Sequence, residues 1–483
     1  MRNRYGSACR YPDKNRVRTV RVAGSGTQAD GREPALSPGH HLQATRWHYR
    51  PVVTDRSFLR PAVLAAGAVL CLVPGTAFAA HPKNDSAVLP RIPLAQFQNR
   101  LLPGSIADDR GVALGGVGSD LFHDKGDRPD EFWAITDRGP NGTVKVGGEE
   151  HVTFPVATFD PVIVKLRVRK NAVKVTRALP ITNRAGRPVT GLPNVEGREE
   201  APYEFDGKTR LAFNPDGIDS EGLVRTRAGE FWVAEEYGPS LLRLDRRGRV
   251  IERHVPQGWT GQGTSYPVKA TLPAILNKRT YNRGFEGLTI SPDGKSLYVA
   301  MQSPLSNPDK KTYKASRNGR ILRFDLRSGK VAGEYVYRFE DVCSFDPASC
   351  GDQNEMKISG LAALDGHRVL VDERTDKVAR VYTVDLRKAT DILGSRWDDE
   401  RTAPSLEKSA EVPAGVAALP KALTVDLAKV PGIPGKIEGI ALAGRRTLAV
   451  INDNDFGLGT FGPDGRLIDS GVRTSITYVP LPG

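Results

Sequence analysis

The sequence lacks the short motifs that mark the most common hydrolases and nucleotide-binding enzymes. It contains no GxSxG nucleophile elbow, no HExxH zinc motif and no Walker phosphate loop. The stretch "GLGTFG" matches GxGxxG by its letters, but no helical pattern follows it, so we interpret it as a turn. These absences argue against serine-hydrolase, zinc-protease and P-loop chemistry.

Cysteine is scarce, and only Cys343 and Cys350 of the four cysteines lie beyond residue 79. They stand in "CSFDPASC", where neither a CxxC pair nor a nearby histidine accompanies them, which disfavours a metal site. Two cysteines are expected to pair in an exported protein, and an export signal is indicated by the apolar run described below. We therefore predict a disulfide between Cys343 and Cys350 that closes a short loop.

A strongly basic patch is missing from the body of the chain, although the net charge is +13. Residues 1–79 hold 12 Lys/Arg and 4 Asp/Glu, which accounts for +8, so the other 404 residues carry only +5. We find no basic stripe interleaved with aromatic residues there, so we do not expect a nucleic-acid partner.

One apolar run is present, "PAVLAAGAVLCLVPGTAFA", and it follows Arg56 and Arg60. A positive start, an apolar middle and small residues at the end are typical of an export signal, here cleaved after Ala79. A membrane anchor is the alternative, but Pro74 and Gly75 break the run, which is shorter than the ~20 apolar residues that a span needs. We therefore expect a secreted or periplasmic protein without a stable membrane anchor.

The chain accordingly divides into three segments. Residues 52–79 are the predicted signal peptide. Residues 1–51 are Arg-rich and precede it, so we interpret them as an extension from a misassigned translation start. Residues 80–483 form the predicted mature domain.

A motif recurs five times in the mature domain. Four copies are "DSEGLVRTRAGEFWVAEEYGP", "GFEGLTISPDGKSLYVAMQSP", "KISGLAALDGHRVLVDERTD" and "KIEGIALAGRRTLAVINDND"; a looser fifth is "VGSDLFHDKGDRPDEFWAITDRGP". In the four closer copies a Leu or Ile and a matching Val lie 10 or 11 residues apart. Each copy therefore predicts two short strands joined by a turn.

Further strand-like segments such as "RILRFDL" follow the copies and complete units of four antiparallel strands. Such units repeated around an axis form a β-propeller. We predict an all-β propeller of about six four-stranded blades, because the irregular segments leave room for one blade beyond the five visible copies. A β-sandwich is the alternative, but it would not explain the repeated motif.

Equivalent positions of successive blades converge near a propeller's axis, so the copies can be compared position by position. Two residues before the first apolar position stand Ser119, Glu221, Glu286, Ser359 and Glu438. Directly after the second strand stand Thr136, Glu235, Met301, Glu373 and Asn452. The next position holds Asp137, Glu236, Gln302, Arg374 and Asp453. Acidic side chains therefore recur where the blades should meet.

A ring of carboxylates needs a compensating charge, because like charges at close range suppress ionisation. Calcium accepts carboxylate and amide oxygens in flexible geometry, whereas zinc is disfavoured because these positions hold no histidine or cysteine. We predict a Ca²⁺ site whose candidate ligands are Glu221, Glu286, Glu373, Glu438 and Asp453. The alternative is that these side chains cap turns or form salt bridges between blades.

Basic residues recur in the same region. Lys357 and Lys436 each stand two residues before a member of the first position, so on a strand they share its face. Arg138, Arg283 and Arg374 lie nearby in the sequence. Cations beside carboxylates favour a small phosphorylated substrate as the partner, and ion pairing between blades is the alternative.

Three stretches, "GEFWVAEEYGPSLLRLD", "NRGFEGLTISPDGKSLYVAMQSPL" and "KIEGIAL", resemble the phytase-like domain family, which is described as having esterase-like activity of phytase. The similarity extends from about Gly104 to the C-terminus, and "EEYGP" is its most specific part. The resemblance implies an exported β-propeller that hydrolyses phosphoesters.

These observations favour an exported, monomeric, calcium-dependent phosphoester hydrolase that acts on a small anionic molecule. We expect Glu236 to accept the proton of the attacking water, with Glu235, Arg138 and Arg374 as further catalytic residues. The expected substrate-binding residues are Lys357, Lys436 and Tyr237. Two other functions stay open: a propeller that binds a ligand without catalysis, and a metal-dependent esterase or lactonase.

Overall fold

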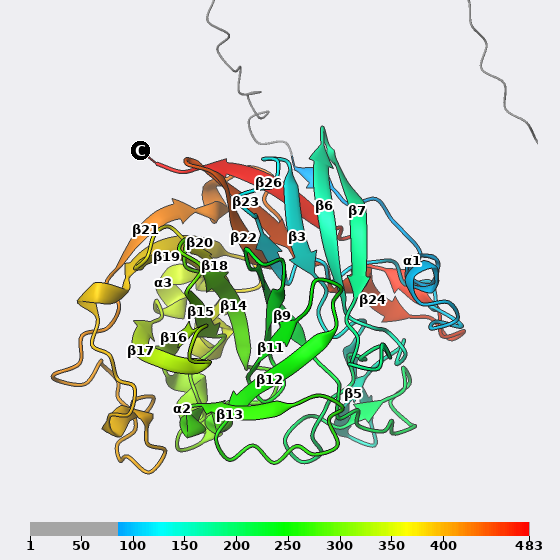
Figure 1. Cartoon of the computed structure of the whole chain (residues 1–483). Coiled ribbons are helices and arrows are strands. Elements are labelled where there is room, and N and C mark those ends of the chain that lie inside the picture. Colours follow the sequence, from blue (N-terminus) through cyan, green and yellow to red (C-terminus); the bar gives the residue numbers. More distant parts are fainter. Residues whose placement is uncertain (1–85, 483) are drawn as a thin grey trace, which may run out of the picture. The chain divides into compact units, whose positions relative to one another are not determined.

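Short strands dominate residues 86–482, which are the residues that the computed structural model describes (Figure 1). Twenty-six strands, none longer than nine residues, confirm the predicted all-β class. Within this range no helix is long and apolar enough to cross a membrane. The predicted extension (1–51) and signal peptide (52–79) lie outside the described residues.

Five groups of strands form the blades of a propeller, and each group contains one copy of the motif. Blade 1 contains β2 (Asp120–Phe122), β3 (Glu131–Ile135), β6 (Val162–Arg169) and β7 (Ala172–Pro180). Blade 2 contains β9 (Ser220–Arg225), β10 (Phe231–Glu235), β11 (Ser240–Leu244), β12 (Val250–Pro256) and the added β13 (Val268–Leu272). Blade 3 contains β14 (Phe285–Ile290), β15 (Ser296–Met301), β16 (Asn318–Asp325) and β17 (Lys330–Arg338). Blade 4 contains β18 (Lys357–Ala363), β19 (Arg368–Arg374), β20 (Ala379–Asp385) and β21 (Lys421–Asp426). Blade 5 contains β22 (Ile437–Gly444), β23 (Thr447–Asn452), β26 (Ser475–Pro480) and β1 (Ala87–Val88).

The remaining elements lie in the connections. Two small sheets consist of β4 (Gly142–Val146), β5 (Glu149–Thr153) and β8 (Pro202–Tyr203), and of β24 (Leu458–Phe461) and β25 (Leu467–Asp469). The α-helices are α1 (Leu94–Leu101), α2 (Lys310–Ala315) and α3 (Val342–Phe345). Short 3₁₀ turns occupy Ala274–Lys278, Pro347–Ser349, Gln353–Glu355, Leu386–Lys388, Arg396–Asp398, Leu427–Lys429 and Asp455–Gly457.

In four of the five blades a glycine in the motif lets the innermost strand pack directly against the next. A Cβ atom at Gly222 would lie 2.6 Å from the carbonyl oxygen of Glu286 in blade 3, so no side chain fits. Gly287 faces blade 4, Gly360 faces blade 5 and Gly439 faces blade 1 in the same way. In blade 1 the position is Asp120, whose carboxylate accepts the amide of Leu223 in blade 2 at 2.7 Å. The five innermost strands therefore form a closed ring.

This ring has five blades, whereas the sequence suggested about six. The irregular segments that left room for a sixth blade are connections and insertions. Residues 388–431 contain a single strand, the outermost one of blade 4, and residues 184–210 contain a single strand, β8. The count of visible motif copies therefore equals the count of blades.

Strand β1 closes the propeller by joining the two ends of the described chain. It pairs antiparallel with β26, where Ala87 lies opposite Ile476, and it also pairs with β7 of blade 1. Blade 5 is thus built from three C-terminal strands and one N-terminal strand. This pairing holds blades 1 and 5 in one continuous sheet.

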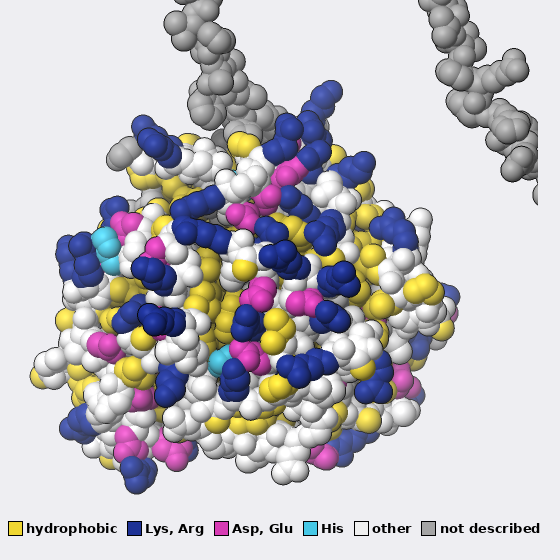
Figure 2. Space-filling view, viewed as in Figure 1, with side chains coloured by type: hydrophobic (Ala, Val, Ile, Leu, Met, Phe, Trp, Pro, Cys, Tyr) yellow, Lys and Arg dark blue, Asp and Glu magenta, His cyan; other side chains and the backbone are white. Residues whose placement is uncertain are grey.

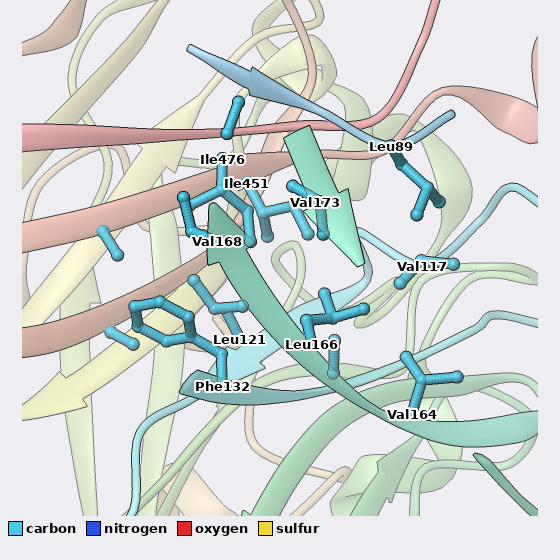
Figure 3. Packing of buried hydrophobic residues seen from close by; sticks show 14 of the residues in the cluster. Leu89, Val117, Leu121, Phe132, Val164, Leu166, Val168, Val173, Ile451 and Ile476 are labelled. Carbon is cyan, nitrogen blue, oxygen red and sulfur yellow. The ribbon is translucent and has the colours of Figure 1, made fainter. Parts of the chain in front are cut away.

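The hydrophobic core is divided among the five interfaces between neighbouring blades. Because side chains alternate along a strand, Trp133 and Ile135 of β3 pack against blade 2, while Phe132 and Ala134 pack against blade 5. Figure 3 shows the interface of blades 1 and 5, where Phe132, Leu166 and Val168 lie near Ile451 and Ile476. Burying each such side chain contributes about 1.5–3 kcal/mol to the stability of the fold. Because both faces of these strands are buried, their residues form a continuous apolar run in the sequence.

The predicted disulfide between Cys343 and Cys350 is present, with the two Cα atoms 4.2 Å apart. The loop that it closes contains Asp346, whose carboxylate accepts a hydrogen bond from the Thr375 hydroxyl at 2.7 Å. Thr375 follows β19 directly, so the disulfide loop supports the turn at the end of that strand.

Charged side chains are scattered over the face seen in Figure 2, where Lys and Arg are more numerous than Asp and Glu. Acidic groups lie among the basic ones over much of this face. The arrangement is that of an ordinary solvated surface.

A buried carboxylate beside α1 links the stability of the fold to pH. Asp160 is 2% exposed and accepts a hydrogen bond from Gln98 of α1 at 2.7 Å. Burial raises the pKa of Asp160 to about 7, although the bond from Gln98 lowers it. An unfolded aspartate titrates near pH 4. The stability that this group contributes is therefore fully present below about pH 4 and is lost as the pH rises through about 7.

We expect the melting temperature of the wild-type protein to decline between pH 5 and pH 8, and the Asp160→Asn variant to lose part of this decline. Asparagine keeps an acceptor oxygen for Gln98 but carries no titrating proton. Buried Glu199 and Glu334, whose pKa values burial also raises to about 7, keep the rest of the decline. Thermal unfolding at four pH values checks this, with the exposed Asp352→Asn as the matched control. An unchanged slope in Asp160→Asn would contradict the assignment.

Candidate functional site

A β-bulge in the innermost strands of blades 2 to 5 aims one motif residue at the propeller axis. In blade 2, Ser220 and Gly222 pair with adjacent residues of β10, which leaves Glu221 outside the ladder. The registers shift in the same way around Glu286, Ser359 and Glu438. Bulges re-aim side chains in this manner beside many active sites.

The bulge residues form one ring of side chains around the axis. A second ring comes from the residue that ends or follows the second strand of each blade. Its members are the column predicted from the motif, namely Asp137, Glu236, Gln302, Arg374 and Asp453, and all five line one cavity. The residue before each of them points the other way, because successive side chains lie on opposite faces of a strand. The strand ends therefore deliver one polar residue per blade to the axis.

The cavity has a volume of about 210 Å³ and lies where these two rings meet. Nine carboxylates line it, together with five cations, so the formal charge is negative by four. The carboxylates are Asp137, Asp219, Glu221, Glu236, Glu286, Asp376, Glu438, Asp453 and Asp455. The cations are Arg138, Arg283, Lys357, Arg374 and Lys436, and Asn141, Asn282 and Gln302 complete the lining.

Blade 2 supplies three carboxylates and no cation to this lining. One oxygen from each of Asp219, Glu221 and Glu236 lies within 4.8 Å of the others. Glu221 also forms such a group with Glu286 and Glu438. The amide of Gln302 donates to Glu236 at 3.0 Å, which leaves its own carbonyl oxygen, Oε1, buried without a hydrogen-bond partner. Oxygen Oε2 of Glu286 is buried and unpartnered as well.

The electrostatics of this carboxylate group oppose ionisation in the protein alone. Burial raises the pKa of Glu221 well above its usual range, and the charges of Asp219, Glu236, Glu286 and Glu438 raise it further. Burial also raises the pKa of Glu236, where Arg283 and Arg138 act in the opposite direction. A positive charge placed among these oxygens would stabilise their ionised forms.

The second triad differs because a guanidinium group donates a hydrogen bond to it, whereas Arg138 only approaches the first triad, with Nη1 3.4 Å from Oδ2 of Asp219. Arg374 is fully buried and donates to Glu438, while its Nη2 lies 3.5 Å from Glu286. Its Nε donates to Ser359 at 2.7 Å and its Nη1 to Asp376 at 3.0 Å. The first triad is therefore the better place for a metal ion.

The remaining cations stand in blades 1, 4 and 5 and, for Arg283, in the connection that leads into β14 of blade 3. Lys357 donates to Asp376 at 2.8 Å, and Lys436 donates to Asp453 at 3.1 Å. Arg138 approaches Asp219 of the first triad, with Nη1 3.4 Å from Oδ2. The cavity thus has a wholly acidic side at blade 2, whereas along the rest of its wall the five cations stand among the other six carboxylates.

Three residues expected in the site lie outside the cavity lining. Glu235 accepts hydrogen bonds from the Ser240 hydroxyl and from the amides of Asp219 and Tyr237, so it caps a turn. Tyr237 is buried and donates its hydroxyl to the carbonyl of Gly191. Glu373 accepts from Tyr337 and from Lys421 in the interface of blades 3 and 4. The other expected residues, Glu236, Arg138, Arg374, Lys357, Lys436, Glu221, Glu286, Glu438 and Asp453, are brought together.

Several lining residues were not among those expected from the sequence. Asp219 stands two residues before Glu221, at the position that Lys357 and Lys436 hold in blades 4 and 5, so the repeat contained a signal for it. Asp376 likewise stands two residues after Arg374, as Asp455 does after Asp453. Asn141 and Asn282 lie in connections between strands, where the motif gives no register.

Backbone strain is concentrated at the same cavity. Among the described residues other than glycine, six have positive φ angles, and three of them line the cavity: Asn282 (52°), Lys436 (49°) and Asp455 (45°). Phe456, at 55°, follows Asp455 directly. Positive φ angles are unfavourable for L-amino acids, and residues that adopt them cluster at functional sites.

The family model described as "Phytase-like: Esterase-like activity of phytase" matches residues 112–456, a range that contains all five motif copies and every residue of the cavity lining. The chain belongs to this phytase-like family.

Comparisons with curated sequences and with solved structures also found proteins that are similar to this phytase-like chain. An uncharacterized secreted protein of Arthroderma benhamiae is 30% identical over 345 residues, which cover 60% of this chain. The match spans 65% of that relative's length.

Solved structures with propeller-like folds are more distant. An aldose sugar dehydrogenase from Streptomyces coelicolor is 12% identical with a TM-score of 0.32, over 77% of this chain and 96% of that one. A calcium-binding protein, regucalcin, from Agrobacterium tumefaciens is 13% identical with a TM-score of 0.31, over 78% and 93% of the two chains. At these scores the likenesses carry no argument about the site.

Proposed function

We propose that this phytase-like protein is a calcium-dependent phosphoester hydrolase that acts in the axial cavity on a small anionic substrate. The observation that carries the proposal is the division of the cavity wall. The Asp219, Glu221 and Glu236 triad lacks a cation of its own blade, whereas blades 4 and 5 contribute cations to the same cavity. A divalent cation fits the first side and a phosphate group fits the second.

The donor set suits calcium in particular. All candidate ligands are oxygen atoms, and the unpartnered oxygens Oε1 of Gln302 and Oε2 of Glu286 are buried in the same lining. Calcium accepts six to eight carboxylate, carbonyl and water oxygens in flexible geometry. When bound, such an ion polarises the phosphoryl group and lowers the pKa of a coordinated water.

The protein's own groups have separate roles in this proposal. Asp219 and Glu221 hold the cation, and Arg138, Lys357 and Lys436 hold the phosphate oxygens. Glu236 takes up the proton of the attacking water at Oε2, because its Oε1 already accepts the amide of Gln302. Arg374 positions Glu438 and Asp376 and supplies fixed positive charge near the phosphate.

Export of the protein is also part of the proposal. The relative from Arthroderma benhamiae is described as secreted, and the Cys343–Cys350 disulfide suits an oxidising compartment.

We expect purified protein of residues 80–483 to hydrolyse an aryl phosphate with calcium and to lose this activity in a chelator. The reason is that the triad alone cannot bring a phosphate anion to the cavity without an intervening cation. Initial rates with p-nitrophenyl phosphate, phytate, p-nitrophenyl acetate and a γ-lactone measure which class of ester the protein prefers as a substrate.

The panel separates the alternatives. Turnover of the acetate or the lactone alone would favour an esterase or lactonase. Calcium binding without turnover of any of the four compounds would favour a ligand-binding propeller.

A further inference from the structure

A second cavity, of about 220 Å³, lies at the opposite ends of the innermost strands. In blade 2, for example, Glu221 near the start of β9 lines the carboxylate cavity, whereas Arg225 at its end lines this one. The close approach of neighbouring strands at the motif glycines lies between the two cavities. We call this the apolar axial cavity.

Apolar side chains from four blades form most of its wall. They are Leu121, Phe122, Ile290, Leu361, Ala362, Ala363, Ile440, Ala441 and Leu442. The volume corresponds to roughly seven water molecules at ~30 Å³ each, enough for a chain of several methylene groups. A concave apolar cavity with a few polar groups at its edge is the usual form of a small-molecule site.

Two cations from different blades converge on the edge of this cavity. Lys125 of the blade 1 turn donates to the carbonyl of Pro292 at 3.2 Å, and Arg227 of the blade 2 turn donates to the same carbonyl at 2.9 Å. Neither forms an ion pair with a carboxylate within residues 86–482. Arg225, by contrast, is paired with Asp124 at 2.7 Å. The carbonyl oxygen of Pro292 thus accepts a hydrogen bond from both cations, and each cation retains further N–H donors.

From this combination we propose that the apolar axial cavity binds a small amphipathic carboxylate, with its alkyl chain in the cavity and its carboxylate at Lys125 and Arg227. Burial of the chain supplies most of the affinity, because apolar surface leaves water. The two cations supply the preference for a charged head group, since charge-assisted hydrogen bonds are stronger than neutral ones. The inference is independent of the phosphoester hydrolase proposed above.

Isothermal titration with decanoate, below its micellar range, tests the site. We expect saturable binding of one decanoate per chain, and at least tenfold weaker binding of decanol. The double variant Lys125→Gln/Arg227→Gln should lose at least tenfold in decanoate affinity while its affinity for decanol stays the same. Equal binding of decanoate and decanol by the wild-type protein, or no saturable binding, would overturn the proposal.

Two further variants locate the site. Ala363→Phe places a ring at the edge of the cavity and should abolish binding of both ligands, with melting temperature as the check on folding. Lys311→Gln/Arg401→Gln removes two exposed cations elsewhere and should bind decanoate like the wild type. Glu236→Gln, in the other cavity, should also bind it normally. A loss in Lys311→Gln/Arg401→Gln equal to that in Lys125→Gln/Arg227→Gln would mean general charge attraction and would contradict the site.

Discussion

The Glu236→Gln variant is expected to turn over a phosphate ester at least about a hundredfold more slowly than the wild type, with a nearly unchanged melting temperature. General acid–base catalysis by one side chain contributes about 10²–10⁴-fold. Glutamine keeps the shape and can still contact Gln302, but it cannot take up a proton or carry the charge that a cation needs. Steady-state rates with p-nitrophenyl phosphate and calcium measure the effect.

The neighbouring Glu235→Gln variant is the matched control. Glu235 is buried beneath a turn, and burial raises its pKa to about 8, so its carboxyl is largely neutral at pH 7. The same substitution there should leave most of the turnover intact. Equal losses in both variants would argue that the change acts through folding and not through the cavity.

A change at Glu221 tests calcium binding directly, without a turnover assay. A ligand that binds only the folded state stabilises it by about 2.7 kcal/mol at a hundred times its Kd, so calcium should raise the melting temperature. In Glu221→Gln this rise should be lost or greatly reduced. A full calcium shift in this variant would place the ion elsewhere.

The Arg374→Met variant is expected to lose about 3–5 kcal/mol of stability in the absence of calcium, the usual cost of removing one partner from a buried ion pair. Arg374 is 2% exposed and touches Glu286, Glu438 and Asp376, so its removal leaves buried carboxylates without their cation. Denaturant unfolding at pH 7 measures the loss.

Calcium provides an internal check on this expectation. An ion in the cavity would offset part of the charge left on Glu286 and Glu438, so the loss should be smaller with calcium than with chelator. The control is Arg401→Met, whose pair with Asp399 lies on the surface and should leave the unfolding midpoint unchanged. A small loss in Arg374→Met that calcium does not alter would mean that these carboxylates are protonated and need no cation.

The repeated motif was sufficient to predict the propeller and most of its axial cavity. Equivalent positions of successive blades converge near the axis, so comparing them brought Glu221, Glu286 and Glu438 together, and the alternation of side chains along each strand directs only every second residue there. The same alternation explains two residues that the sequence placed wrongly. Glu235 and Glu373 stand one residue before Glu236 and Arg374, and a shift of one residue turns a side chain to the opposite face.

The rest depended on backbone geometry that no sequence pattern reveals. Asn141 and Asn282 reach the cavity from connections, and Asn282 does so in a left-handed conformation. The number of blades depended on whether residues 388–431 held a complete blade, and they hold a single strand. Strand β1 is only two residues long, too short for any periodicity to indicate.

The pairing of β1 with β26 also sets the order in which the fold is completed. Ala87 pairs with Ile476, and almost the whole length of the domain lies between them in the sequence. The entropy lost on closing this loop is therefore larger than for any other strand pairing in the ring. For a polypeptide that emerges from a translocation channel with its N-terminus first, blades 1 to 4 obtain all their strands early, but blade 5 waits for residues 475–480. The ring of blades can therefore close only when β26 is available to pair with β1.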